Sequence, residues 1–420
     1  MATTRMRRHV TLTDQARERY PGLPFDVDGA VESVEVSLRV TTTGARAVVD
    51  LGCEGPHGLR GWSGGARTGF VITRADATPG YLPGLETGRW RVLLGLHVLP
   101  EDGADIEVVV RSPATRLPDH GPAEDPVSRG IRGSDRGLPA PAGLTWYAGD
   151  PHNHSLHSDG ELSLWELANE GIRSGLDYLG CTDHNTVSHH VHLAAVGARQ
   201  GITLVPGQEI TTHRGHANAW GDIGVIDFRR PAQTWVDEVD ARGGVMSVNH
   251  PVSGDCSWTQ PLERAPRGAE LFHGSWYRNL TDTSIWAWFL NWTRDVAVLG
   301  GGDFHNRSTP LRPGMPTTWV AAEACEPDAL IEAIRAGRTT ITGSARMVGE
   351  GEARPVLMDV PTLVRQGEDL LALDAAGTIL VDLGGRRLVI GERRQLVRAP
   401  RESGPFCLVR ADRSVVALCA

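Results

Sequence analysis

The sequence predicts an α/β protein in which a barrel of strands and helices lies between an antiparallel β-sandwich and a small C-terminal β unit. Three observations support this fold class. Polar and apolar residues alternate in short runs between residues 28 and 112, with Gly and Pro turns between them. Apolar runs followed by helical stretches occupy residues 147 to 343, as in parallel β/α units. Short hairpin-like strands return after about residue 348.

The first predicted domain covers residues 1–145. Its strands are expected in the runs SVEVSLRV, RAVVDLG, RWRVLLGLHVL and DIEVVV. The segment from Pro113 to Gly143 is rich in Pro, Gly, Asp and Arg and has no apolar periodicity, so it is expected to be a linker or a surface strap. A domain boundary near Thr145 follows.

The second predicted domain is a barrel over residues 146–345. Its strands are expected in DYLGCTDH, ITLVPGQEI, GVMSVNHP, AELFHG and VAVLGGGDFH, and its helices in stretches such as LSLWELANEGIRSG and PDALIEAIRAG. Seven or so strand–helix units favour a closed barrel, in which chemistry collects at the C-terminal ends of the strands. Residues 346–420 then form a small C-terminal β domain, with GTILVDLGGRRLVI as its clearest hairpin.

Composition excludes several classes of protein. The net charge of -9 and the absence of a long basic run argue against nucleic acid as a partner. No uncharged apolar stretch approaches the ~18 residues that cross a bilayer, and the N-terminus lacks the pattern of a signal peptide. The six cysteines are scattered without a C-x-x-C pair, as expected of thiols in the cytoplasm. Nothing indicates the oligomeric state.

Histidines concentrate in the middle domain. Twelve of the sixteen lie between His152 and His305, and nearly every apolar run there ends in a residue that can bind metal. Residues two apart in a strand face the same way, so the H-x-H and D-x-H pairs each direct two side chains to one side. Mixed imidazole and carboxylate donors suit zinc, manganese or iron, and Glu209 could bridge two such cations. The residues at the ends of the runs are His152, His154, Asp183, His184, Glu209, His250, Asp303 and His305.

Six motifs in this region resemble those of the PHP (polymerase and histidinol phosphatase) superfamily. They are GDPHNHSLHSDG, CTDHNT, PGQEIT, GHANAWG, VNHP and GGDFHN, in this order. The resemblance implies a distorted seven-stranded β/α barrel, similar to a TIM barrel. The leading segments GWSGGAR, ATPGYLPG and GRWRVLLGLHV, together with GHANAWG, resemble more closely the subgroup that contains the carbaryl hydrolases.

The resemblance also implies a set of two or three divalent metal ions, manganese, zinc or iron. A first metal would be held by His152, His154, Glu209 and Asp303. A second would be held by Glu209, His250 and His216, where His216 is preferred to the neighbouring His213. A third would be held by Asp159, His184 and His305. Three-metal members have a histidine where Asp159 or Gly160 stands here.

Several nearby side chains have more than one interpretation. Asp183 is expected to orient a histidine ligand, and Asp159 could instead cap the helix that follows. His157 is expected in a solvated or supporting role, although it could protonate a leaving group, and His273 is expected to be structural, although it could contact substrate. Arg214, Arg278 and Arg307 could clamp an anionic group, with a surface salt bridge as the alternative for each.

The predicted function is a metal-dependent hydrolase that acts on a small-molecule ester, with a metal-activated hydroxide as the nucleophile. The superfamily resemblance implies a phosphoesterase, with Glu209, Asp303 and His305 as catalytic residues. The closer subgroup implies carboxyl-ester or carbamate cleavage as the alternative. A non-catalytic metal-containing binding protein is a further alternative. No G-x-S-x-G elbow suggests a serine nucleophile.

Overall fold

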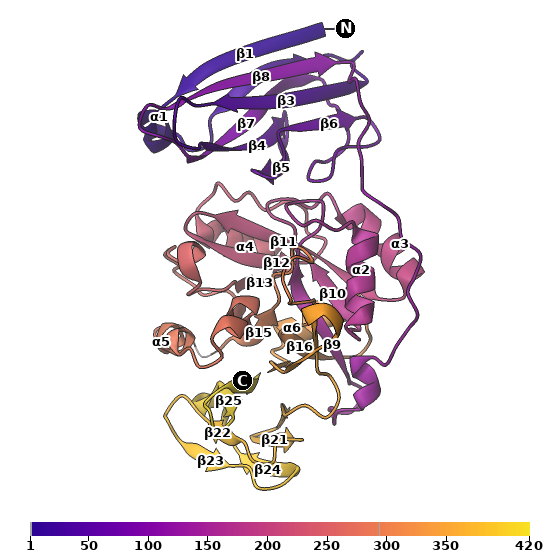
Figure 1. The fold of residues 1–420 in the computed structure, drawn as a ribbon, viewed down its shortest axis with the longest axis vertical. Coiled ribbons are helices and arrows are strands. Elements are labelled where there is room, and N and C mark those ends of the chain that lie inside the picture. The colour runs from indigo at the N-terminus through magenta and orange to yellow at the C-terminus, as the bar shows by residue number, and fades with distance from the viewer. Residues whose placement is uncertain (1, 294) are drawn as a thin grey trace. The chain divides into compact units, whose positions relative to one another are not determined.

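The computed structural model describes residues 2–293 and 295–420, without the side chain of Asp255. The chain divides into two compact units (Figure 1). The first unit comprises Met1–Pro122, Ser155–Ser163 and Asp183–Val191. The second unit comprises Ala123–His154, Leu164–Thr182 and His192–Ala420. Two short segments from the middle of the sequence therefore belong to the first unit.

The first unit contains two four-stranded antiparallel sheets, ordered β1-β8-β3-β6 and β2-β7-β4-β5. Alternate residues of β8 are buried, namely Ala104, Ile106 and Val108, because successive side chains of a strand point to opposite faces. One hydrophobic cluster combines residues of both sheets. The elements are β1 Ala2–Val10, α1 Leu12–Arg17, β2 Gly22–Val27, β3 Ser33–Thr41, β4 Val48–Gly55, β5 Gly58–Gly64, β6 Gly69–Thr73, β7 Gly88–Val98 and β8 Ala104–Ser112.

Strands begin well before residue 28, where the sequence pattern first indicated them. The strand β1 pairs with β8 from Ala2 opposite Ser112 to Val10 opposite Ala104. Most of β1 is exposed on both faces, so it lacks the alternation of apolar residues that reveals a half-buried strand. Its partner is distant in sequence, which no local pattern can show.

The second unit is built on a 13-stranded sheet in the order β15-β14-β13-β12-β11-β10-β9-β16-β17-β26-β25-β22-β23. The strand β10 lies parallel to β9 and β11, and β14 lies parallel to β13 and β15. The strand β12, however, is antiparallel to both of its neighbours. An isolated parallel bridge joins Asn153 of β9 to Phe304, just after β15. The strands are β9 Thr145–Asn153, β10 Tyr178–Cys181, β11 Thr203–Thr212, β12 Gly215–Trp220, β13 Val245–Val248, β14 Gly268–His273, β15 Ala297–Gly301, β16 Thr317–Ala322 and β17 Thr339–Thr342.

Helices of the second unit pack through apolar stripes. In α2, Leu164, Leu167, Ala168, Gly171 and Ile172 are buried, which is the spacing of one helix face. In α6, Pro327 occupies the first turn, where its missing N–H costs no hydrogen bond, and the buried residues of the helix join a cluster with β12, β13 and β16. The helices are α2 Leu164–Arg173, α3 His190–Gln200, α4 Ala232–Ala241, α5 Ser284–Leu290 and α6 Pro327–Arg335, with short 3-10 turns η1 Gly133–Arg136, η2 Gly254–Cys256 and η3 Gly274–Arg278.

The C-terminal strands continue the large sheet, because β26 pairs with β17. The predicted hairpin in GTILVDLGGRRLVI is confirmed, with β22 antiparallel to β23. The remaining elements are β18 Ala345–Met347, η4 Gly349–Gly351, β19 Ala353–Pro355, β20 Thr362–Gln366, β21 Asp369–Leu373, β22 Ile379–Val381, β23 Arg387–Val389, β24 Arg394–Arg398, η5 Arg401–Ser403, β25 Phe406–Val409 and β26 Val415–Cys419.

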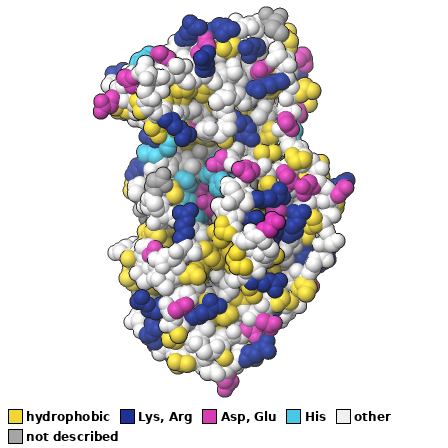
Figure 2. All heavy atoms as spheres, viewed as in Figure 1, with side chains coloured by type: hydrophobic (Ala, Val, Ile, Leu, Met, Phe, Trp, Pro, Cys, Tyr) yellow, Lys and Arg dark blue, Asp and Glu magenta, His cyan; other side chains and the backbone are white. Residues whose placement is uncertain are grey.

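Two further features concern the helices and the surface charges. No helix in the described ranges is both long and apolar enough to cross a membrane. Basic and acidic side chains are interspersed over the face seen in Figure 2.

Candidate metal centre

The H-x-H pair lies at the end of β9 with both imidazoles fully buried. Both rings direct Nε2 to the same carboxylate oxygen. Oδ1 of Asp303 is 3.3 Å from His152 Nε2 and 2.9 Å from His154 Nε2. The intervening Asn153 points elsewhere and donates to the carbonyl oxygens of Asp150 and Gly180. The strand period of two thus places both imidazoles on the same side, as the spacing predicted, and their role as ligands stays a prediction.

Glu209 occupies the middle of the cluster. This residue of β11 is fully buried. Its Oε1 lies 3.3 Å from His152 Nε2, 3.2 Å from His216 Nδ1 and 3.3 Å from His250 Nε2, and its Oε2 lies 3.7 Å from His154 Nε2. One carboxylate therefore contacts donors of both predicted metal positions.

The donor set fits a divalent cation. Ligands that each bond an ion at about 2.1 Å, at angles between octahedral and tetrahedral, are separated by roughly 3.0–3.4 Å. Most separations in the cluster are close to this range. His152 Nε2 and Asp303 Oδ1 are buried and make no hydrogen bond within the described residues, although buried polar atoms are normally paired. The groups His152–His154–Glu209 and His152–His250–Asp303 are each compact enough to hold one ion.

Hydrogen bonds on the far side of the rings fix which nitrogen faces the cluster. Glu270 Oε1 lies 2.7 Å from His152 Nδ1, so the proton of a neutral ring is held at Nδ1 and the lone pair of Nε2 is directed inward. Nδ1 of His305 lies 2.8 Å from the carbonyl oxygen of Asp303, which can only accept, so Nε2 again carries the lone pair. The second carboxylate oxygen of Glu270 accepts from the backbone N–H of His250 at 2.9 Å.

Electrostatic interactions among the side chains of the cluster favour protons on the imidazoles. Burial acts to lower the pKa of His152, but the charges of Glu270, Asp303 and Glu209 prevail and raise the pKa well above the ordinary value. Burial likewise acts to raise the pKa of Asp303, yet the neighbouring histidines hold it well below its usual range. Protons therefore supply the positive charge that a cation would supply at the same place.

Two glycines, Gly301 at the end of β15 and Gly302 directly after it, allow these groups to approach one another. A Cβ on Gly301 would collide with Glu270 Oε1, and one on Gly302 would collide with Asp150 Oδ2. Asp150 is completely buried and accepts from the backbone N–H groups of His152, Gly302 and Gly314. Burial raises the pKa of Asp150 to about 7. Asp150 thus ties the ligand-bearing end of β9 to the backbone just before Asp303.

The predicted third metal position is divided between the units. Asp159 and His184 lie in the first unit, where Asp159 Oδ1 is 3.5 Å from His184 Nε2. His305 lies in the second unit. Within the first unit, Asp183 accepts from the N–H and Oγ–H of Ser155, and His157 Nδ1 lies 2.7 Å from Ser188 Oγ. The third position stays a prediction.

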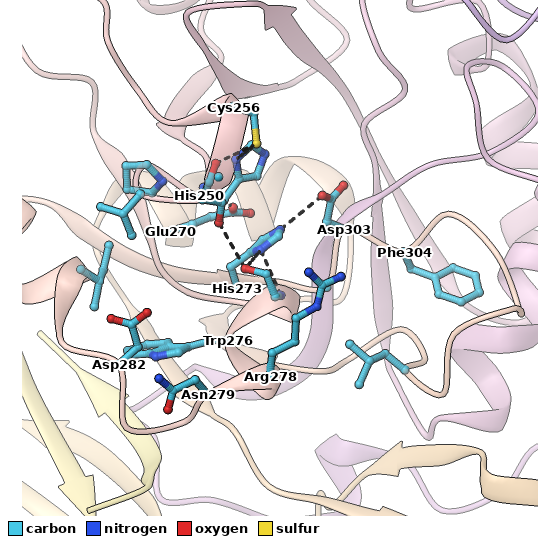
Figure 3. A pocket seen from close by; sticks show the side chains of 18 of the residues that line it. His250, Cys256, Glu270, His273, Trp276, Arg278, Asn279, Asp282, Asp303 and Phe304 are labelled. Carbon is cyan, nitrogen blue, oxygen red and sulfur yellow. Dashed lines mark hydrogen bonds and ion pairs between the residues drawn. The ribbon is translucent and has the colours of Figure 1, made fainter.

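A pocket of about 620 Å³ in the second unit is lined by five residues of the site, His250, Glu270, His273, Asp303 and His305. Figure 3 shows the side chain of Arg278 extending toward Asp303 and His273. Polar groups line part of the pocket, and apolar side chains, among them Val252, Trp276, Ile285 and Leu311, line the rest. The pocket therefore combines the metal-binding cluster with a largely apolar wall.

The three predicted anion-binding arginines differ in placement. Arg278 is exposed, lines the pocket and has no ion pair or hydrogen bond within the described residues. The guanidinium of Arg307 lies 2.9 Å from Glu170 Oε1, and Arg214 donates to the carbonyl oxygen of Thr259 at 2.9 Å. Neither Arg307 nor Arg214 lines the pocket. Only Arg278 is placed to meet a ligand there.

Sequence reasoning missed two supporting residues, Asp150 and Glu270, and it expected a structural role for His273, which lines the pocket. Glu270 is 1% exposed in the middle of an apolar run, AELFHG, and a carboxylate in such a run was the available signal. Asp150 precedes the first histidine pair by two residues and so shares its side of the strand. The preference for His216 over His213 agrees with the geometry, because His213 is exposed on the turn between β11 and β12.

No family model matches the chain, and no curated protein matches it either. Among solved structures, it is similar to a two-domain protein of Bacteroides vulgatus described as containing a predicted PHP-like metal-dependent phosphoesterase, with 17% identity and a TM-score of 0.41 over 71% of this chain and 91% of that one. A proposed metal-dependent phosphoesterase of Bifidobacterium adolescentis shares 15% identity, with a TM-score of 0.30 over 39% of this chain and 90% of that one. An amidohydrolase of Chromobacterium violaceum with bound sulfate and no metal shares 17% identity, with a TM-score of 0.28 over 38% and 88%. All three TM-scores are low, so the interpretation of the site rests on its own residues.

Proposed function

We propose that this protein is a metal-dependent hydrolase of the PHP type that cleaves small phosphate esters. The observation that carries the proposal is the convergence of four histidines and two carboxylates, from five different strands or strand ends, around Glu209. A structural metal site would bury the cluster on every side, whereas His250 and Asp303 open onto a pocket large enough for a small molecule.

Two cation positions follow from the donor set. His152, His154, Glu209 and Asp303 would hold the first ion, and Glu209, His216 and His250 the second. The nitrogen and oxygen donors suit manganese, zinc or iron. When bound, such ions lower the pKa of water to produce a nucleophile near neutral pH and neutralise charge that develops on a substrate oxygen.

The protein's own residues hold the substrate and the ligands. Glu209 joins the two positions, and we assign Glu209, Asp303 and His305 to the reacting centre. Arg278 offers an uncommitted guanidinium beside Asp303, and a guanidinium matches the paired oxygens of a phosphate. This side chain favours a phosphate ester over the neutral carboxyl and carbamate esters.

The finer architecture is also part of the proposal. The seven strands β9 to β15 would form a distorted barrel that closes at the bridge between Asn153 and Phe304. The two sheets of the first unit would form a β-sandwich. Domain boundaries at 145/146 and 345/346 and a relationship to the carbaryl hydrolases stay predictions.

The test is hydrolysis by the full chain, purified without chelators and supplied in turn with manganese, iron and zinc. We expect metal-dependent turnover of p-nitrophenyl phosphate or bis-p-nitrophenyl phosphate and little turnover of 1-naphthyl esters. Metal analysis should find two or more ions per chain. Glu209→Gln should abolish turnover, and His213→Ala, a change at an exposed histidine, should not.

Each other outcome has a definite meaning. Turnover of 1-naphthyl esters alone would replace the phosphoesterase assignment by the carboxyl-ester one. Inactivity on a broad panel, with metal bound, would favour a non-catalytic binding protein. Arg278→Ala should raise KM for the phosphate substrates at least tenfold, since a charged hydrogen bond contributes about 1.5–3 kcal/mol.

A further inference from the structure

His273 lies inside the site, although its sequence position suggested a structural role. It ends β14 and caps the short turn η3. Its ring centroid is 4.8 Å from that of His250 and 6.1 Å from that of His152. Its Nε2 is 3.3 Å from Oδ2 of Asp303, and Figure 3 shows the ring directed toward that carboxylate.

The hydrogen bonds of Nδ1 determine the tautomer of His273. Nδ1 lies 3.2 Å from the backbone nitrogen of Ser275 and accepts its hydrogen bond, and it lies 2.9 Å from Ser275 Oγ, whose hydroxyl can donate to the same nitrogen. A backbone amide can only donate, so Nδ1 carries the lone pair and the proton of a neutral ring is at Nε2. This is the reverse of His152 and His305, whose Nδ1 atoms face oxygen acceptors.

A protonated Nε2 cannot coordinate a cation. His273 is close enough to His152 and Glu270 to form a three-residue metal group by distance alone. Coordination through Nε2 would require the proton to move to Nδ1, where it would meet the N–H of Ser275. The tautomer therefore distinguishes His273, whose Nε2 carries the proton, from the histidines whose unprotonated Nε2 can bind a cation.

The two oxygens of Asp303 have different surroundings. Oδ1 faces the Nε2 atoms of His152 and His154, and Oδ2 lies 3.3 Å from Nε2 of His273, a buried atom with no other partner within hydrogen-bond distance among the described residues. The backbones that carry His273 and Asp303 also pass close to each other, because a Cβ on Gly274, the residue after His273, would collide with the carbonyl oxygen of Gly302. Asp303 itself has a φ of +53°, a strained conformation that its surroundings must maintain.

We propose that His273 is a positioning residue that donates from Nε2 to Oδ2 of Asp303, so that Oδ1 alone faces the cation. The proposal rests on the proposed function, since it assigns Asp303 as a ligand. By holding one oxygen, His273 keeps the carboxylate in a single orientation. It acts on the reaction through Asp303 and makes no bond to a metal.

The test compares His273→Ala and His273→Asn with the wild type and with His213→Ala. An asparagine retains an N–H donor that the alanine lacks. We expect His273→Ala to keep the wild-type number of metal ions per chain and to lose about 10–100-fold in kcat, with little change in KM. The loss should be equal for p-nitrophenyl and phenyl phosphate, because the leaving group is not the point of action. His273→Asn should recover part of the loss, and His213→Ala should match the wild type.

A second measurement does not need turnover. Long-range ¹H–¹⁵N spectra of protein labelled at histidine report the tautomer, with the His273 signal assigned by its loss in His273→Asn. We expect the Nε2–H form. If His273→Ala fails to fold, the spectrum and the asparagine variant still decide the matter.

Four results would overturn the proposal. They are an Nδ1–H tautomer, the loss of one bound ion in His273→Ala, a rate loss in that variant that is larger for phenyl phosphate, and an unchanged kcat in that variant. Failure of the proposed function would be distinguishable from failure of this proposal, because the wild type itself would then show no metal-dependent turnover of phosphate esters.

Discussion

Glu270→Gln is the change that most directly tests how the site is supported. Glu270 is buried and uses both oxygens, one on His152 Nδ1 at 2.7 Å and one on the backbone N–H of His250 at 2.9 Å. It therefore contacts a proposed ligand of each metal position. Glutamine has nearly the same shape, so the substitution removes the charge and one acceptor without leaving a cavity.

The structure sets the size of the expected effect. A glutamine has one acceptor oxygen for two donors, so its NH₂ group must face either the ring of His152 or the N–H of His250. A buried donor left without an acceptor costs about 1–3 kcal/mol. Loss of a carboxylate behind a histidine ligand typically weakens metal affinity about 10–100-fold, or roughly 1.4–2.7 kcal/mol, which is the same range.

The assay is calorimetric titration of metal-free protein with zinc or manganese at pH 8, with Glu368→Gln as an exposed control. We expect a 10–100-fold weaker Kd in Glu270→Gln and an unchanged Kd in the control. The variant should also release fewer protons, because Glu270 is a leading cause of the raised pKa of His152. Equal affinities for wild type and Glu270→Gln would refute the argument that Glu270 supports the ligands.

Four further predictions follow from the same geometry. The pKa values of His152 and His250 are raised well above 6.5, so metal binding should release protons and should become tighter as the pH rises above 6.5. Calorimetric titrations in buffers of different ionisation enthalpy should show this proton release. Identical apparent enthalpies in these buffers would contradict the prediction. The pKa of Asp150 is raised from 3.8 to about 7, so between these pH values the folded protein binds one more proton at this carboxyl than the unfolded chain does. The contribution of Asp150 to the free energy of unfolding therefore falls as the pH rises from 3.8 to about 7. Urea unfolding should accordingly depend less on pH in Asp150→Asn than in the wild type. Cys256 Sγ lies 3.5 Å from His250 Nδ1, so Cys256→Ala should weaken metal binding by up to about tenfold, and unchanged affinity would make the thiol incidental. Gly301→Ala should lower the free energy of unfolding by about 1–3 kcal/mol, since the new methyl group collides with Glu270; a thermal melt equal to the wild type would show that the strand can shift.

The sequence indicated the residues at the centre of the site better than the residues that hold them in place by hydrogen bonds. The proposed ligands at the ends of apolar runs, such as His154 and Glu209, are recognisable because imidazoles and carboxylates are seldom buried at strand ends unless they bind something there. Glu270 and Asp150 act through hydrogen bonds to a ring nitrogen and to backbone amides. Glu270 is 118 residues from His152 in the sequence, and Asp150 is 152 residues from Gly302. No local sequence pattern reveals contacts between residues so far apart.

Individual elements were predicted well where burial leaves a clear pattern in the sequence and less well elsewhere. The parallel strands are short, continuously buried apolar runs, and α2 has clear helical periodicity. The antiparallel strand β12 was seen only as a motif that carries His216, because its connection to β11 is a tight turn at residues 213–214 that contains neither a helix nor a proline. The edge strand β1 has no buried face to reveal it. The segments 155–163 and 183–191, which belong to the first unit, follow from contacts that the sequence does not show.

The dispersal of the cluster along the chain has a consequence for biosynthesis. The proposed ligands lie between residues 152 and 303, and Asp303 follows the last strand of this region, β15. A nascent chain that has emerged from the ribosome only as far as β14 therefore contains the histidine pair but lacks the Asp303 carboxylate that both rings approach. Occupancy of the first proposed position should then follow the completion of β15, whereas the proposed donors of the second position, Glu209, His216 and His250, are already present in the shorter chain. Exposure of newly made chains to chelators should therefore lower the yield of active protein without slowing the folding steps that precede it.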